Sequence, residues 1–174
     1  LLSLASEEHQ DRYLSGLAKG SVLTVALNEP GSSQPDRPAT TLAGGVLNGT
    51  KLAVGYAADA EWLVVTADSG VAVVRGDAEG VSMTKTPSAT GADEFVVTFR
   101  DVAVAAEDVL ADTDPHRVNQ VVLAAFGAFA AGLMAGALRL TADYVATREQ
   151  FGRPLSTFQT VAAQLSEVYI ASRT

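Results

Sequence analysis

The spacing of apolar residues changes twice along the chain. Residues 4–19 follow a helical period, and Gly20 is suited to end that helix. From Ser21 the apolar residues come in short runs rich in β-branched side chains, which is typical of strands. Residues 93–101 alternate strictly, so that one face carries three large side chains, Phe95, Val97 and Phe99. A short helix followed by several strands is therefore predicted.

Two turn sequences join some of these runs into predicted hairpins. Asn48-Gly49 lies between two apolar runs and is the strongest short-range hairpin signal. Asp68-Ser69-Gly70 separates residues 61–67 from residues 71–75 and predicts a hairpin with a three-residue loop. Six or more short strands at this spacing favour an antiparallel β-sandwich or barrel.

After Pro115 the pattern becomes helical. One long helix is predicted from His116 to about Thr147, and a second from Phe158 to the end of the chain. The fold class is therefore α+β and multidomain, an antiparallel β-sandwich or barrel followed by helices of an α-helical bundle. We expect three parts: residues 1–20 as the end of an N-terminal helical domain, residues 21–114 as a β domain, and residues 115–174 as the first, truncated part of a C-terminal helical domain.

The long helix contains 18 consecutive residues without a polar side chain, Val121–Leu138. That length would suit a membrane span, and Ala128, Gly132 and Gly136 repeat at the spacing that lets membrane helices approach closely. Against this, 7 of the 18 residues are alanine and 3 are glycine, and no Trp or Tyr lies at either end of the run. We favour a helix that is buried on all sides in a soluble bundle, with no membrane span.

Composition narrows the possible chemistry. The chain has no cysteine and two histidines, which excludes thiolate chemistry and argues against a metal site. Its net charge of −8 argues against nucleic-acid binding. Residues 1–114 hold 17 acidic and 7 basic side chains, whereas residues 115–174 hold 3 acidic and 5 basic ones. Residues 115–174 therefore carry a slight positive excess, which would favour an anionic ligand in this part of the chain.

The segment between the two predicted helices offers the clearest candidate site. Gly152 and Pro154 break the helix, and Ser156 with Gln159 would form a capping box, so a purely structural explanation is available. The same segment combines two arginines, two aromatic side chains and a helix N-terminus. That combination suits a ligand with both a phosphate and a ring that can stack, such as an adenine nucleotide.

This segment reads R-x-Q-F-G-x-P-L-x-x-F-Q, and it follows a β-rich region that carries N-E-P-G and L-N-G-x-K. In these strings and in the order of its elements, nearly the whole chain resembles the acyl-CoA dehydrogenases. The resemblance implies FAD as the cofactor and α,β-desaturation of an acyl-CoA thioester as the reaction. It also implies that the loop crosses a subunit interface to the pyrophosphate and adenine side of a neighbour's FAD, with cofactor contacts from Arg148, Gln150, Phe151, Phe158 and Gln159.

The chain departs from the family where the flavin ring would lie. The family has T-E-P-x-A-G-S and N-G-x-K followed by W-I-T, whereas this chain has Asn28 in place of the threonine and Gln34 in place of the serine. Ala53 and Gly55 stand in place of the tryptophan and threonine of W-I-T. Residues 118–138 contain no ionisable side chain, so no catalytic base is available there, and we assign no catalytic residue.

Keeping the adenine-side residues and losing the flavin-ring residues is similar to the base-less subunits of actinobacterial heteromeric acyl-CoA dehydrogenases, which act on steroid side chains. The hypothesis is a cytoplasmic flavoprotein subunit whose homologous partner supplies the base. Two alternatives stay open: a non-catalytic assembly subunit of the same fold that has lost FAD binding, and a membrane-anchored β domain. The missing initiator methionine suggests that the chain is the middle of a longer one.

Overall fold

The computed structural model describes residues 7–89, 91–110 and 113–172, and the chain divides into two compact units, Leu1–Val122 and Leu123–Thr174. We call the first the β unit and the second the helical unit. The β unit has these elements: α1 (Glu7–Leu17), β1 (Val22–Ala26), β2 (Thr41–Ala43), β3 (Val46–Gly55), β4 (Ala60–Ala67), β5 (Gly70–Arg75), β6 (Val81–Thr86), β7 (Glu94–Ala103), β8 (Val109–Leu110) and the start of α2 (Pro115–Thr147). The first predicted helix is confirmed over its described residues.

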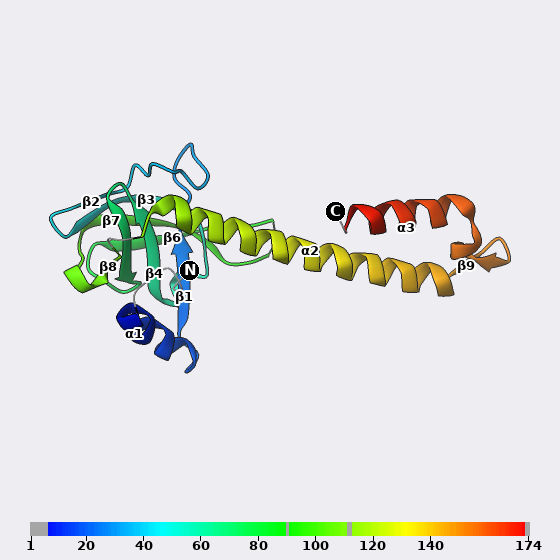
Figure 1. Ribbon diagram of the computed structural model, residues 1–174, viewed down its shortest axis with the longest axis horizontal. Coiled ribbons are helices and arrows are strands. Elements are labelled where there is room, and N and C mark those ends of the chain that lie inside the picture. The colour runs from blue at the N-terminus through cyan, green and yellow to red at the C-terminus, as the bar shows by residue number, and fades with distance from the viewer. Residues whose placement is uncertain (1–6, 90, 111–112, 173–174) are drawn as a thin grey trace. The chain divides into compact units, whose positions relative to one another are not determined.

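Two four-stranded sheets build the β unit (Figure 1). One has the strand order β1-β4-β5-β8 and the other β2-β3-β7-β6. Neighbouring strands pair antiparallel except for β1 and β4, which pair in parallel with Thr24 opposite Leu63. The predicted sandwich is confirmed, with this one parallel pair added to it. β6 was not predicted, because its solvent-facing positions are polar and only Val81 and Met83 pack toward the core.

The core lies between the inward faces of the two sheets. Buried side chains from both sheets meet there, among them Leu63 and Val65 of β4 and the predicted face of β7, Phe95, Val97 and Phe99. A second apolar cluster covers the outer face of the first sheet, where Tyr13 of α1 and Val118 and Val122 of α2 pack against Val64 and Val73. This cluster attaches both helices to the sheet by burying apolar area.

The predicted turn at Asn48-Gly49 is wrong. β2 and β3 turn at Gly44-Gly45, whose φ angles of +59° and +77° suit the tight turns of two-residue hairpins. Asn48 lies inside β3, and its side chain is used elsewhere: its amide nitrogen donates to a carboxylate oxygen of Asp101 at 3.1 Å, and its amide oxygen accepts from the Asp101 N–H at 2.8 Å. The second predicted hairpin is confirmed, although Gly70 pairs with Ala67 and leaves a two-residue loop.

The helical unit consists of the rest of α2, a two-stranded ribbon of β9 (Glu149–Gln150) and β10 (Arg153–Pro154), a 3₁₀ turn at Leu155–Thr157, and α3 (Gln159–Ala171), which runs back along α2 (Figure 1). Both predicted helices are confirmed. The apolar helix is not buried on all sides as expected: among the described residues its first turns pack on the first sheet, α3 covers part of the rest, and 6% of its most apolar stretch is buried. Along the described length of α2 the buried residues are Val118, Asn119, Val122 and Val145.

Candidate functional site

A tight hairpin connects α2 to α3. The end of α2 is closed by a hydrogen bond from the Arg148 N–H to the Tyr144 carbonyl oxygen (2.8 Å). β9 and β10 then pair, with Arg153 opposite Gln150, and the Leu155 N–H returns to the Arg148 carbonyl oxygen at 2.8 Å. The backbone thus forms a closed turn of about two residues, which holds the side chains around it in fixed directions.

Phe151 forms the tip of this hairpin in a strained conformation. Its φ is +53°, in the left-handed region that bulky side chains avoid, and the following Gly152 has φ of +76°. The Phe151 ring is 92% exposed. Positive φ at both residues is what a two-residue hairpin turn requires, but a large, exposed apolar side chain is unusual at such a turn, and exposed apolar side chains often mark binding sites.

A second aromatic ring lies behind the tip. The rings of Phe151 and Phe158 meet edge to face, with centroids 6.1 Å apart and planes at 73°. The guanidinium carbon of Arg153 lies 4.1 Å from the centroid of Phe158, a cation–π contact. Phe158 is the residue immediately before α3, so this cluster of three side chains sits at the N-terminus of that helix.

The positive groups of this loop have no anionic partner among the described residues. No ion pair joins Arg148 or Arg153 to any described carboxylate. The predicted capping box of Ser156 and Gln159 is wrong, because Ser156 lies in the 3₁₀ turn and no side chain caps α3. Two arginines and an uncapped helix N-terminus together suit a phosphate, and the exposed ring of Phe151 with the half-buried ring of Phe158 suits a flat ring.

All five residues predicted to contact a cofactor lie in this loop: Arg148, Gln150, Phe151, Phe158 and Gln159. The Gln150 side chain donates to the Glu149 carbonyl oxygen at 2.8 Å. Their cofactor role stays a prediction. Arg153 was counted in the sequence as one of the two arginines of this segment but was not assigned a cofactor contact.

The β unit contains a buried ion pair between the two other motif segments. Glu29 is 5% exposed and Lys51 is fully buried, and the Lys51 ammonium donates to the Glu29 carboxylate at 2.8 Å. The ammonium also donates to the Thr66 hydroxyl at 3.1 Å. The same carboxylate accepts from the backbone N–H of Ala39 at 2.6 Å and from the backbone N–H and hydroxyl of Thr40 at 2.9 and 2.6 Å. An acidic residue beside Pro-Gly is most simply expected in a solvated turn, and for Glu29 that sequence-based expectation is wrong because the side chain is buried.

This hydrogen-bond network and the burial of the pair shift the pKa values of Glu29 and Lys51. Burial alone would raise the pKa of Glu29, but the hydrogen bonds from Lys51, Thr40 and Ala39 outweigh it and lower the pKa to about 2. Burial lowers the pKa of Lys51, and the Glu29 carboxylate opposes that effect. Both groups are charged at neutral pH, and they connect the loop after β1 to strand β3.

The residues at the family's flavin-ring positions are small or polar. Ala53 is exposed with φ of +49°, at an irregularity in the pairing of β3 with β7. A Cβ atom built on Gly55 would meet no atom within 4 Å. The Asn28 side chain accepts from the Gln34 N–H at 3.2 Å, so it stabilises the loop itself. Among the described residues, no group of three or more His, Asp or Glu side chains could hold a metal ion.

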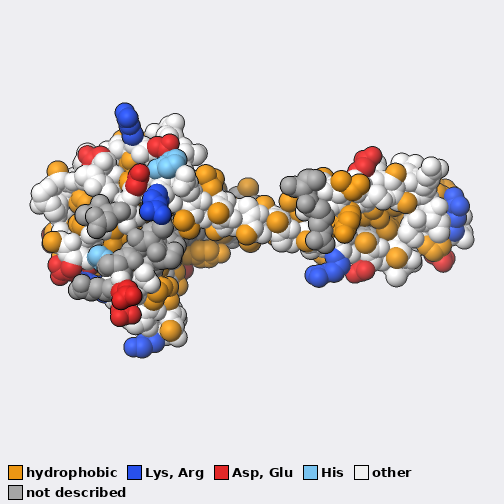
Figure 2. All heavy atoms as spheres, viewed as in Figure 1, with side chains coloured by type: hydrophobic (Ala, Val, Ile, Leu, Met, Phe, Trp, Pro, Cys, Tyr) orange, Lys and Arg blue, Asp and Glu red, His pale blue; other side chains and the backbone are white. Residues whose placement is uncertain are grey.

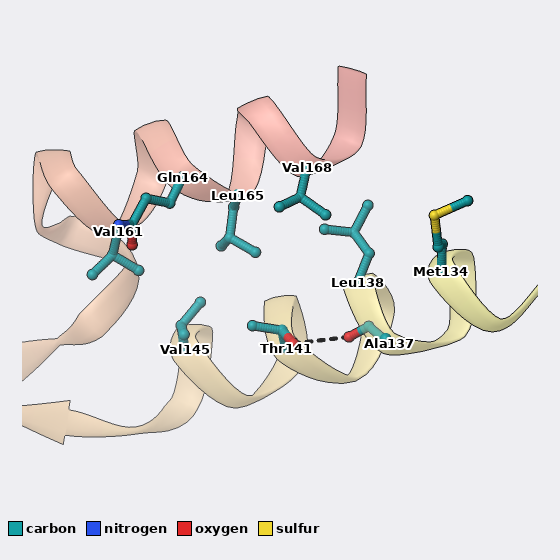
Figure 3. Close-up of a pocket in the computed structure, with 9 residues that line it drawn as sticks. All are labelled: Met134, Ala137, Leu138, Thr141, Val145, Val161, Gln164, Leu165 and Val168. Carbon is teal, nitrogen blue, oxygen red and sulfur yellow. Dashed lines mark hydrogen bonds between the residues drawn. The ribbon is translucent and has the colours of Figure 1, made fainter. Parts of the chain in front are cut away.

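The helical unit exposes a broad apolar surface. Figure 2 shows hydrophobic side chains along its face, and the large exposed ones on α2 and α3 are Leu123, Phe126, Phe129, Leu133, Met134, Leu140, Tyr144, Val168, Tyr169 and Ile170. A groove of about 400 Å³ runs between the two helices (Figure 3). Val161, Leu165 and Val168 of α3 face it, opposite Leu138, Thr141 and Val145 of α2.

One helix among the described residues, α2, is long and apolar enough to cross a membrane by length and composition, and 6% of its most apolar stretch is buried. Soluble bundles contain helices that pass the same test, so this is weak evidence for a span. An apolar patch of this size marks a surface that another element or another protein covers.

Comparison with known proteins gives a consistent result. Residues 124–174 match the family model described as acyl-CoA dehydrogenase, C-terminal domain. Acyl-CoA dehydrogenase FadE28 of Mycobacterium tuberculosis is 66% identical over 174 residues, which are 100% of this chain and 51% of FadE28. The chain spans about half the length of the curated relatives it matches.

Solved structures of the same fold include two heteromeric assemblies. The ChsE4-ChsE5 complex from Mycobacterium tuberculosis matches with a TM-score of 0.85 and 28% identity, over 99% of this chain and 49% of that chain. A variant of the Tcur3481-Tcur3483 steroid ACAD matches with a TM-score of 0.77 and 34% identity, over 97% of this chain and 48% of that chain.

Proposed function

The chain belongs to the acyl-CoA dehydrogenase family, and on that premise we propose that it forms part of a flavoprotein subunit that acts in a heteromer. In this proposal the loop from Arg148 to Gln159 holds the pyrophosphate and adenine side of an FAD that is shared across a subunit interface. A homologous partner subunit provides the catalytic base. The reaction is the α,β-desaturation of an acyl-CoA thioester.

The observation that carries this proposal is the strained, exposed Phe151 beside two arginines without described anionic partners. In the proposed roles, Arg148 pairs with the pyrophosphate, since a guanidinium can donate two parallel hydrogen bonds to phosphate oxygens. Phe151 and Phe158 provide apolar faces for the flat part of the nucleotide, and Gln150 and Gln159 provide amide groups at its edge. The N–H groups in the first turn of α3 add a positive end that favours an anion.

FAD, when bound, supplies the hydride acceptor for the desaturation, and the residues of this chain do the binding. No ionisable side chain occurs between Val118 and Leu138, so this stretch of α2 cannot abstract a proton. Ala53 and Gly55 themselves carry neither the aromatic ring nor the hydroxyl that the family has at these two positions. A partner that supplies these groups accounts for both features.

Two further observations favour a partner subunit. Among the described residues, ten large apolar side chains of α2 and α3 are exposed, and clustered apolar side chains often mark a surface that is covered in the assembled protein. Two structural neighbours with more than 25% identity are heteromeric, and one of them is described as a steroid ACAD. We therefore propose a steroid-derived acyl-CoA as the substrate class, a cytoplasmic location, and a covered apolar surface in place of a membrane span.

The test is the flavin content of the complex. The full chain is purified with its candidate partner, and bound FAD is measured from the flavin absorbance band per heteromer, for wild type and for Arg148→Ala. We expect the variant to assemble normally and to lose most of its FAD. Arg139→Ala is the matched control, since Arg139 lies on the same helix and carries the same charge; it should keep its FAD. Equal FAD content in all three proteins would overturn the proposed binding role.

The alternative is a non-catalytic assembly subunit that has lost FAD binding. The open space at Gly55 and the small side chain of Ala53 favour it, because neither residue can contact a flavin ring closely. In that case the wild-type complex contains only the FAD that its partner binds alone. Comparing the FAD content of the isolated partner with that of the complex distinguishes the two functions.

A further inference from the structure

Arg153 is the one arginine of the helical unit whose guanidinium lies on an aromatic ring among the described residues. Its Cζ atom is 4.1 Å from the centroid of Phe158, close enough for the planar group to stack on the ring. Arg153 belongs to β10, and Phe158 directly precedes α3, with the 3₁₀ turn between them. The contact therefore ties the hairpin to the start of the helix.

Few other contacts hold the hairpin in place. Phe151 at its tip is 92% exposed, so the tip has almost no packing of its own. The ribbon pairs only two residues on each side, and the Leu155 N–H bond to Arg148 closes it. Phe151 must also be kept at φ of +53°, a conformation that is populated only when its surroundings impose it. The hairpin turn sets this backbone conformation, and the ring contacts of Phe158 with Phe151 and Arg153 are the aromatic contacts of the tip among the described residues.

We propose that Arg153 is a positioning residue: it stacks on Phe158, and through that ring it keeps Phe151 extended toward the bound nucleotide. The inference rests on the proposed FAD-binding function and adds a residue to it. Arg153 differs in role from Arg148, which lies at the end of α2, has no ring beside it and is proposed to contact phosphate directly. Arg153 affects the affinity for FAD indirectly, by holding the ring of Phe158 in place.

The test is a double-mutant cycle on FAD affinity, measured by flavin fluorescence titration of the heteromer stripped of its cofactor. The proteins are wild type, Arg153→Met, Phe158→Leu and the double variant, with Arg139→Met as the control. We expect Arg153→Met to weaken FAD binding by about 3- to 10-fold in the wild-type background, and by less than about 2-fold when Phe158 is already leucine. Arg153→Lys, which keeps the charge but not the planar stack, should recover only part of the loss.

Hydrogen exchange of the protein without FAD gives a second readout. Losing the stack should speed exchange of the Leu155 amide several-fold in Arg153→Met and leave it unchanged in Arg139→Met. An equal loss of FAD affinity in both Phe158 backgrounds would mean that Arg153 contacts phosphate directly, and the proposal would be overturned. Unchanged exchange and unchanged affinity would overturn it as well. A wild-type heteromer that binds no FAD refutes the proposed function instead, whatever the exchange at Leu155.

Discussion

Replacing Lys51 by methionine is expected to destabilise the β unit by about 3–5 kcal/mol, the usual effect of removing one partner of a buried ion pair. Methionine fills the space of the lysine stem without a charge, so the main change is electrostatic. Glu29 then stays buried at 5% exposure with no counter-charge, and Thr66 loses a hydrogen-bond donor.

Two estimates from the structure agree with this magnitude. At the Lys51–Glu29 distance of 2.8 Å, and with an effective dielectric constant of about 20, the attraction is about 6 kcal/mol before the desolvation of both groups is subtracted. Lowering the pKa of Glu29 from its ordinary value of 4.5 to about 2 corresponds to about 3 kcal/mol in favour of the ionised carboxylate. The second figure is smaller than the first because the burial of Glu29 raises its pKa and so opposes the effect of its hydrogen bonds.

The assay is urea unfolding followed by the fluorescence of Trp62, the single tryptophan, which lies in β4 and packs edge to face on Tyr13 at 5.2 Å. Lys85→Met is the control, because Lys85 is an exposed residue of the same unit, paired with Asp93, and should lose less than about 1 kcal/mol. The double variant Lys51→Met with Glu29→Gln should be more stable than the sum of the two single losses predicts. The reasoning is refuted if Lys51→Met loses no more than the Lys85 control, or if the two losses simply add.

Two further predictions concern the β unit. Since Glu29 has a lowered pKa, its ion pair contributes fully above the ordinary value of 4.5 and is lost as the pH falls toward about 2; acid titration of wild type should therefore show a loss of stability in this window that Glu29→Gln does not show. Gly80→Ala should lose about 1–3 kcal/mol in urea titrations, because Gly80 has φ of +87° and a Cβ atom there would overlap the Arg100 carbonyl oxygen; Gly55→Ala, with open space around it, should unfold like wild type.

Local patterns predicted most of the secondary structure. The alternation in residues 93–101, the short loop at Asp68-Ser69 and the long apolar helix are all signals that depend on neighbours in the sequence. The pairing of strands that are distant in the sequence could not be predicted: nothing in residues 22–26 indicates that β1 pairs in parallel with β4. The prediction of a turn at Asn48-Gly49 was wrong because Asn48 instead lies inside β3, where its side chain makes two hydrogen bonds with Asp101. This tertiary contact outweighs the local preference of Asn-Gly for a turn.

The candidate loop was predictable as a location, since its residues are consecutive. What could not be read from the sequence is that Phe151 takes a strained conformation and that Arg153 lies on the ring of Phe158. Both depend on how a two-residue turn directs the chain. The burial of Glu29 was missed for a similar reason, because its partner Lys51 is 22 residues away and its other partners are backbone N–H groups.

The β unit keeps the family's motif where it holds the fold together and departs from it where it would contact a flavin ring. Glu29 and Lys51 are retained, and each would leave a buried, unpaired charge if the other were lost, so folding alone is enough to maintain them. Ala53 is exposed and Gly55 faces open space, so the fold makes no demand on either side chain, and only a ligand would. Folding requirements therefore account for Glu29 and Lys51, whereas the fold alone does not determine the residues at positions 53 and 55. The helical unit shows the opposite case: the hairpin turn needs positive φ at position 151 but not a large apolar side chain, so the exposed ring of Phe151 is a feature that the proposed ligand contact would explain.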